Sequence, residues 1–266
     1  QTVANNITLE GTGVGGYALF NSNASAGTVS GGITLANSAT IGGSNPVNIS
    51  GVISGASKAL TIAGTSTVTL TNTETYTGAT TINSGATLSL GDGTTAGTLD
   101  SASAITDNGT LTFNAPANVT YAGVLSGTGV VNKLGTGILT LGNSSSNSTY
   151  SGGTTVNAGT LKAGSSNAPF GSGAVTVASG ASVDVNGKTV ANNITLEGTG
   201  VGGYALFNSS STTGTVSGGI TLANSATIGG ANPVKVSGVI SGASKALTIA
   251  GTSTVTLTNT ETYTGA

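Results

Sequence analysis

The chain is built from short runs in which two apolar residues flank one polar residue. Runs such as Ile7-Thr8-Leu9, Leu60-Thr61-Ile62 and Leu139-Thr140-Leu141 alternate with a period of two residues, which places the apolar side chains on one face of a strand and the hydroxyl on the other. Further runs are Ile33-Thr34-Leu35, Val68-Thr69-Leu70, Leu88-Ser89-Leu90, Leu111-Thr112-Phe113, Val175-Thr176-Val177 and Val183-Asp184-Val185. Turn-forming pairs such as Ser84-Gly85 separate the runs, and no apolar stripe has the period of a helix. The pattern predicts an all-β protein.

A long tandem duplication organises these runs. Residues 2–79 recur at 189–266 with seven differences, four of them together in the small residues 23–26, which is typical of a solvated loop. The chain therefore contains one full long repeat, 1–187, and the start of the next, 188–266, which duplicates 1–79. We expect a continuous repeat structure without independent globular domains. Because neither end carries the atypical capping segment of repeat arrays, we also expect a longer parent array.

The core that these runs can form is narrow. Aromatic residues make up 4% of the chain, too few for tandem β-sandwiches, whose cores use bulky side chains. Pairs of Val, Ile and Leu suit a right-handed parallel β-helix (β-solenoid), in which each turn buries its aliphatic side chains against the next. With roughly 20 residues per turn and ~4.8 Å between turns, one period would climb about 45 Å. The runs start 8 to 36 residues apart, so we expect the outward Thr rows to stack unevenly.

Composition excludes several function classes. The chain has no Cys and no His, so it cannot build the common zinc, haem and iron–sulfur sites, a His general base or a Cys nucleophile. All six basic residues are Lys and the net charge is -2, which leaves no electrostatic footprint for nucleic acid. No apolar run approaches the ~20 residues of a membrane-spanning helix. We expect no enzyme activity, no cofactor, no nucleic-acid partner and no membrane insertion of this segment.

Two motifs have chemical interpretations that compete with simpler ones. Residues 11–16 satisfy G-x-G-x-x-G, but a nucleotide site needs a helix after the glycines and none is predicted, so we expect a glycine-rich turn. Asp92, Asp100 and Asp107 form the densest acidic group and are weak calcium candidates. Solvated turn residues are the simpler interpretation of these three aspartates.

Tyrosines and one loop are the candidates for contact with a partner. Tyr17, Tyr76 and Tyr150 could stack on sugars, although covering the edges of turns is the simpler interpretation. Asn21, Ser22 and Asn23 begin the variable loop and are the polar candidates. The acidic pairs Glu10/Glu197 and Glu74/Glu261 are copies one period apart, so we do not interpret either as a catalytic pair. Glu74, beside Tyr76, could contact a glycan, but a charge on the rim of a turn is the simpler interpretation.

One stretch resembles a known family. Residues 123–164 contain Lys133-Leu134-Gly135-Thr136-Gly137, then Thr149-Tyr150-Ser151-Gly152, then Gly153-Thr154-Thr155-Val156-Asn157-Ala158-Gly159-Thr160-Leu161, and residues 51–90 hold a degenerate copy. This skeleton is similar to the autotransporter-associated β-strand repeat, also called the passenger-associated transport repeat. The resemblance implies a right-handed β-helical passenger or giant surface protein, secreted to the surface of Gram-negative-type bacteria.

These observations favour a structural function. We expect a segment of an extracellular fibre or stalk, a stiff rod whose partners are its own neighbouring repeats and other copies of the fibre, assembled into filaments, sheath or biofilm matrix. The alternative is an adhesin module that binds glycans or another cell through loops such as 21–27. A polysaccharide-degrading β-helix enzyme is disfavoured because the eight acidic residues are spread along the chain.

Overall fold

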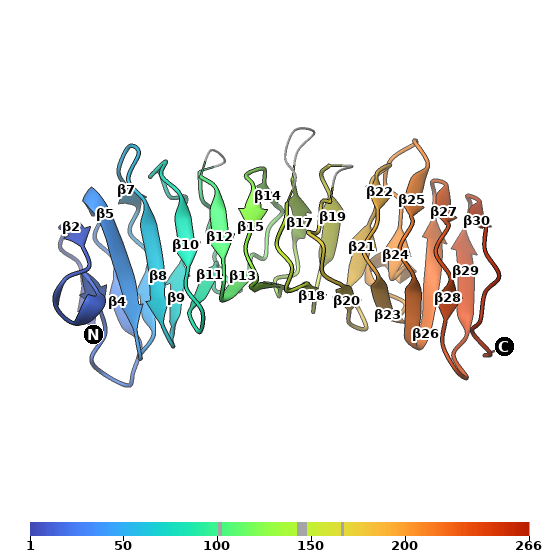
Figure 1. Cartoon of the computed structure of the whole chain (residues 1–266), viewed down its shortest axis with the longest axis horizontal. Helices are drawn as coiled ribbons and strands as arrows, with labels where there is room; N and C mark the ends of the chain where they lie inside the picture. The colour runs from blue at the N-terminus through green and yellow to red at the C-terminus, as the bar shows by residue number, and fades with distance from the viewer. Residues whose placement is uncertain (101–102, 143–147, 166–167, 266) are drawn as a thin grey trace.

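The computed structural model describes residues 1–100, 103–142, 148–165 and 168–265. They form a parallel β-solenoid of about 11 turns, stacked along the long axis from the N-terminus to the C-terminus (Figure 1). Every strand pairing found among the described residues is parallel. Helical structure there is limited to two single 3-10 turns, η1 (Val14–Gly16) and η2 (Val201–Gly203). The predictions of an all-β chain and of a parallel solenoid are confirmed.

Each turn contributes a segment to each of three stacks, which form the faces of the solenoid. The first stack is β1 (Thr2–Val3), β4 (Gly27–Val29), β6 (Val47–Ile49), β9 (Thr67–Leu70), β11 (Thr87–Leu90), β13 (Thr110–Phe113), β16 (Val130–Lys133), β18 (Thr154–Val156), β20 (Val175–Val177), β23 (Ile194–Gly198), the first half of β26 (Ile220–Gly230) and β28 (Ile240–Ser241). The second stack is β2 (Ile7–Gly11), the first half of β5 (Ile33–Gly43), β7 (Ile53–Ser54), β14 (Val119–Tyr121), β17 (Ile138–Leu141), β19 (Thr160–Ala163), β21 (Ser182–Asp184), β24 (Leu206–Phe207), the second half of β26 and β29 (Leu247–Gly251). The third stack is β3 (Leu19–Phe20), the second half of β5, β8 (Leu60–Gly64), β10 (Thr80–Ile82), β12 (Ile105–Asp107), β15 (Leu125–Ser126), β22 (Thr189–Val190), β25 (Gly214–Val216), β27 (Val234–Val236) and β30 (Val255–Leu257). Among the described residues, the turns between β7 and β14 of the second stack, and between β15 and β22 of the third, cross that face without a named strand.

Apolar columns run down the inside of the solenoid. Leu60, Ile62 and Ile82 are fully buried, and Ile62 of β8 pairs in register with Ile82 of β10. Burial of each aliphatic side chain of this size contributes roughly 1.5–3 kcal/mol. Since a single turn covers each side chain from one side only, the core is completed by stacking.

Rows of small polar residues run down the outside in even register. Along the first stack the central positions pair in sequence as Thr2, Thr28, Asn48, Thr69, Ser89, Thr112, Asn132, Thr155, Thr176, Thr195, Thr221 and Ser241. The expectation of uneven Thr rows is therefore wrong. Loops of different length absorb the uneven spacing, so paired residues lie from 19 apart (Val175 and Ile194) to 26 apart (Ile194 and Ile220).

Two strands are longer than the sequence pattern predicts. β5 and its copy β26 each run for 11 residues and pair with strands of two different stacks. At the end of β5, Gly42 has a φ of 155°, and a Cβ there would lie 1.7 Å from the Ala63 carbonyl oxygen. Gly42 thus allows the close approach of the second half of β5 to β8. The strand crosses the corner at the exposed residues 36–38, beyond residues 33–35 that the pattern alone indicates.

Candidate interaction surfaces

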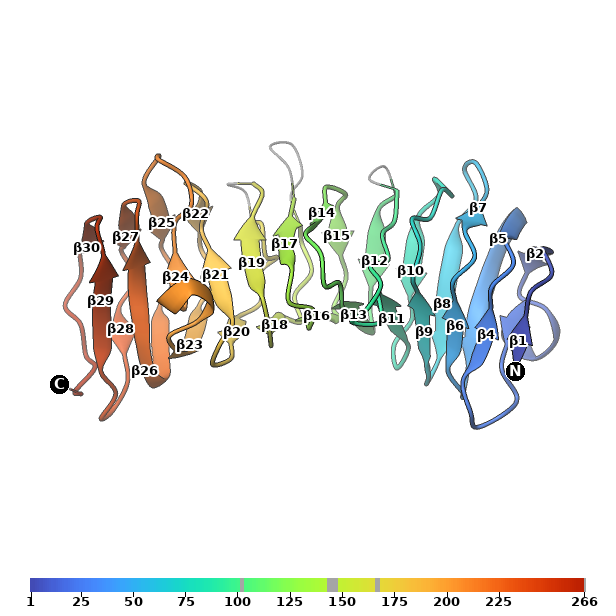
Figure 2. The same ribbon diagram turned by 180° about the vertical axis from the view of Figure 1, so that it is seen from behind.

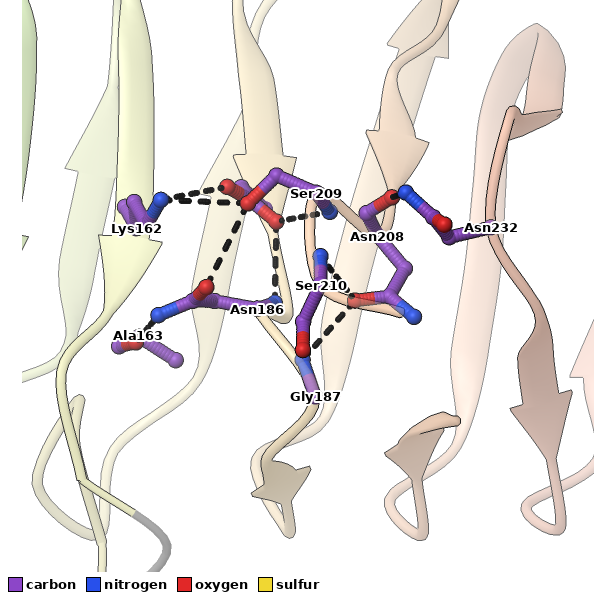
Figure 3. A network of polar contacts seen from close by, with 9 residues as sticks. Lys162, Ala163, Asn186, Gly187, Asn208, Ser209, Ser210 and Asn232 are labelled. Atoms are coloured by element: carbon purple, nitrogen blue, oxygen red, sulfur yellow. Dashed lines mark hydrogen bonds and ion pairs between the residues drawn. The ribbon is translucent and has the colours of Figure 1, made fainter. Parts of the chain in front are cut away.

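The variable loop is tied to the solenoid by an asparagine. In the second copy, the Oδ1 of Asn208 accepts hydrogen bonds from the N–H groups of Gly187 (2.8 Å) and Ser210 (3.1 Å) (Figure 3). Its Nδ2 donates to the carbonyls of Thr212 (2.8 Å) and Pro233 (2.7 Å). Asn208 is buried, with 1% of its surface exposed. Its amide therefore connects its own loop to the turns before and after it.

The same asparagine in the first copy is the predicted candidate Asn21. Its Nδ2 donates to the carbonyls of Ser25 (2.8 Å) and Pro46 (2.9 Å), and its Oδ1 accepts the N–H of Asn23 (3.0 Å). Asn21 thus organises the loop, and its polar atoms are engaged within the chain. Ser22 and Asn23 are exposed and remain candidates for contact with a partner.

A second network anchors the copy of Ser22. Lys162 Nζ lies 3.6 Å from Asp184 Oδ2 and 3.1 Å from Ser209 Oγ, and Asp184 Oδ1 accepts the N–H of Ser209 at 2.9 Å (Figure 3). Asp184 is buried and Lys162 is half-buried. The ion pair therefore fixes the loop of one turn on the strand of the turn before it.

A shallow apolar groove lies beside the loop in both copies. In the first copy it has a volume of about 370 Å³ and is lined by residues that include Val14, Tyr17 and Phe20. The Tyr17 and Phe20 rings are 6.4 Å apart, and Val14 and Phe20 are exposed. The second copy repeats the groove, about 330 Å³, with Val201 and Phe207 in the matching places. No charged residue lines either groove.

The glycine motif beside this groove is a turn, as predicted. Gly11, Gly13, Gly15 and Gly16 all have positive φ, and a Cβ on Gly13 would lie 2.3 Å from the carbonyl oxygen of Tyr17. Because the motif leads into a single 3-10 turn rather than a helix, it presents no helix N-terminus to a phosphate.

Two of the predicted tyrosine candidates are inside the protein. Tyr76 and Tyr150 are fully buried, and their hydroxyls bond to Thr80 Oγ1 (2.7 Å) and Thr154 Oγ1 (2.6 Å). The prediction that Tyr76 and Tyr150 contact a partner is wrong, because their rings fill the corner of the solenoid core. Tyr17 is partly exposed and remains a candidate for contact with a partner.

The three aspartates do not form a metal centre. Asp92 is exposed, and its Oδ1 accepts hydrogen bonds from Thr94 and Thr95 of its own turn, whereas Asp107 is fully buried. Within the described ranges, no three acidic residues lie close enough together to hold an ion. The calcium interpretation of Asp92, Asp100 and Asp107 therefore has no support from their arrangement.

Sequence reasoning missed the burial of four ionisable residues, of which Asp184, in an outward position of its strand, is described above. The other three occupy inward positions. Glu74, expected on the rim of a turn, is 1% exposed, Asp107 is fully buried and Lys133 of the repeat motif is 2% exposed. Burial raises the pKa of Glu74 to about 8 and that of Asp107 to about 6, and it lowers the pKa of Lys133 to about 8. Each of the three lies two positions from a buried residue, namely Tyr76, Ile105 or Val131, so a period of two residues places all three on the inward side. That signal was present in the sequence.

The fold and its surfaces define a solenoid built from repeats, with a row of small polar residues along the first stack and an uncharged groove beside each copy of the variable loop. Comparison with known proteins specifies the repeat: residues 60–90 and 131–163, about a quarter of the chain, match the Passenger-associated-transport-repeat. The chain carries two copies of this repeat, and the resemblance drawn from its motifs is confirmed.

A curated protein and the solved structures complete the comparison. An adhesin named BmaC autotransporter, from Brucella suis biovar 1 (strain 1330), is 44% identical over 92 residues, which are 34% of this chain and 3% of that protein. The chain thus spans a small part of the length of this relative. No solved structure matches the chain.

Proposed function

We propose that this chain is a non-catalytic, rod-forming segment of a secreted bacterial surface protein of the autotransporter passenger type. The observation that carries the proposal is the unbroken first stack, in which every turn from β1 to β28 pairs with the next. Such pairing gives a stiff rod and covers successive strand edges that would otherwise recruit other chains. Among the described residues, no helix is long and apolar enough to span a membrane.

The rod offers surfaces for association with other copies of itself. Ten of the twelve Thr, Ser and Asn rungs of the first-stack row are at least partly exposed, whereas Ser89 and Thr112 are buried. Charged residues make up 5% of the chain. Little electrostatic repulsion therefore opposes side-by-side contact. We propose that neighbouring rods associate laterally in a fibre, sheath or biofilm matrix.

Analytical ultracentrifugation of the purified chain tests this association. We expect concentration-dependent species larger than one chain, with little change between low and high salt because the contacts are uncharged. Monomeric rods at millimolar concentration in both salts would reject lateral association. Small-angle X-ray scattering on the same samples would show an elongated particle, and a compact particle would reject the rod itself.

An adhesin module is the second candidate, which the similarity to an adhesin and the repeated groove both favour. In this case the loop 21–27 and the groove beside it bind a glycan. A glycan array probed with the chain and with variants in which loop 21–27, loop 208–214 or both loops are shortened would test the idea, because both copies carry the groove. Full retention by the variant with both loops shortened would exclude these loops as the binding site.

A further inference from the structure

The 187-residue period does not correspond to a whole number of solenoid turns. Nine pairing steps along the first stack lead from β1 through β4, β6, β9, β11, β13, β16, β18 and β20 to β23. In sequence, however, β23 is the copy of β2, since Ile7–Gly11 recurs as Ile194–Gly198. The copy of β1 is β22, which precedes β23 and lies in a different sheet.

The period is therefore one face short of nine turns. Each turn passes through the first, second and third stacks in that order. β22 follows β21 of the second stack and precedes β23 of the first, so it lies on the third face, one face before the place in the first stack that a nine-turn period would give it. One period thus equals eight turns and two thirds of a turn. With ~4.8 Å between turns, this corresponds to a rise of about 42 Å.

The other two stacks show the same displacement. β3 pairs with the second half of β5 in the third stack, whereas its copy β24 pairs with β21 and with the second half of β26 in the second stack. The groove of Tyr17 and Phe20 therefore recurs on a neighbouring face as the groove of Tyr204 and Phe207. Figure 2 shows η2 on the near side, beside β24.

We infer that a tandem array of this period presents every surface feature on each of its three faces in turn. A third period would place the groove on the remaining face, and a fourth would return it to the first. The arrangement repeats after three periods, which comprise 26 turns. This inference concerns the register of the array and holds whether or not the rod associates laterally.

The displacement determines how the array can meet a partner. A period of nine turns would align all grooves and loops on one side, so contacts through one feature would join rods in pairs or ribbons. Displacement by one face distributes the same feature around the axis. Any partner that recognises the groove or the loop then binds the rod from three directions, and contacts between rods through such a feature extend in three directions.

The absence of cysteine from the chain allows a direct test of the register. Three double-cysteine variants share Thr176→Cys and differ in the second site. Thr195→Cys is its partner in the displaced register and Thr155→Cys is its partner on the other side. Thr189→Cys, in the copy of β1, would be the partner in a nine-turn register. Paired strands ~4.8 Å apart suit the Cα separation of a disulfide.

We expect the 155/176 and 176/195 variants to form the disulfide under mild oxidation and the 176/189 variant to stay reduced. The 155/176 variant controls for folding, because its strands pair in either register. Disulfide formation in the 176/189 variant would overturn the inference, whether or not the separate 176/195 variant also forms its disulfide. On assembled arrays of three or more periods, image reconstruction should give a rotation of one third of a turn per period, and a pure translation would equally overturn it.

Discussion

Buried ionisable side chains give single residues control over the pH dependence of stability. Glu74 Oε2 accepts the Ile53 N–H at 2.5 Å, while Glu74 Oε1 and Asp107 Oδ2 are buried without a hydrogen-bond partner among the described residues. Burial raises the pKa of Glu74 from 4.5 to about 8 because it penalises the ionised form. The folded chain therefore holds this proton at pH values where the unfolded chain releases it.

For Glu74→Gln we predict a flatter dependence of stability on pH. An acid with a raised pKa stabilises the fold fully below its ordinary value of 4.5, and this contribution is lost as the pH rises to about 8. The wild-type chain should lose roughly 2–4 kcal/mol of unfolding free energy over that window through this residue. The amide cannot ionise, so the variant should lose much less.

Denaturant unfolding at pH 5, 6, 7 and 8 measures this difference. The exposed Glu10 provides the matched control, because Glu10→Gln should leave the wild-type slope unchanged. Asp107 should leave a smaller slope below pH 6 in all three proteins, since its pKa is also raised. Equal slopes for wild type and Glu74→Gln across pH 6–8 would contradict the assignment.

For Lys133 we predict that a change of charge is tolerated better than a loss of volume. Its Nζ donates to the carbonyls of Gly135 and Ala158, yet Ile62 occupies the same position of the degenerate repeat and is fully buried. Lys133→Met should change stability by less than about 1 kcal/mol or increase it, because a buried charge is often replaced by an apolar group without loss. Lys133→Ala should cost about 2–4 kcal/mol through the cavity. Thermal denaturation ranks the two variants, and a Met variant as unstable as the Ala variant would show that the ammonium itself is required.

At the scale of the turn, a tyrosine and a threonine four residues later form one unit. The pairs Tyr76–Thr80 and Tyr150–Thr154 are both buried and hydrogen-bonded. Tyr150→Phe should cost about 1–2 kcal/mol, because Thr154 Oγ1 is then left without its partner. Tyr150→Phe with Thr154→Val should recover part of that loss. A double-mutant cycle from denaturant unfolding measures the coupling, and additive effects would show that the hydrogen bond contributes nothing.

The asparagine of the variable loop offers a matched comparison between copies. Asn208 makes four hydrogen bonds and is buried by turns on both sides, whereas Asn21 makes three and is partly exposed. Asn208→Ala should cost about 2–3 kcal/mol and Asn21→Ala about 1 kcal/mol, because buried partners lose more when they are left unpaired. Urea unfolding of the two variants checks the order. A larger loss at Asn21 would contradict the role of the preceding turn.

Much of each turn could be predicted from the period of two residues, and the reasons for the failures are physical. The pattern identifies Leu60 and Ile62 as inward because an aliphatic residue has no alternative place in a strand. The same pattern places Glu74 inward, but a charged residue is ordinarily exposed, so the sequence favours the rim of a turn. The pattern could not predict the register, that is, which residues of successive turns pair with one another. Register depends on the lengths of the loops between strands, and these lengths differ from turn to turn.

At the scale of the whole molecule, we expect the long repeat to be a unit of sequence and not of folding. Pairing across the boundary at 187/188 is as regular as elsewhere: β20 pairs with β23, and β21 pairs with β24. The core of each copy is completed by the turns of the other copy that stack on it. If 1–187 and 188–266 are not independent domains, as predicted, the turns on both sides of the boundary should be equally stable.

Hydrogen exchange tests this continuity directly. In a solenoid each turn is held by its two neighbours, so amide protection should be highest in the interior turns and should decrease gradually towards the first and last turns. The strand amides of β20, β21 and β23 should exchange as slowly as those of β16 to β19. Leu139→Ala, which removes a buried side chain of β17, should reduce protection most in the turns that pair with it and least in β5. A protection minimum at 187/188, or a loss that stops there, would show that two units fold separately.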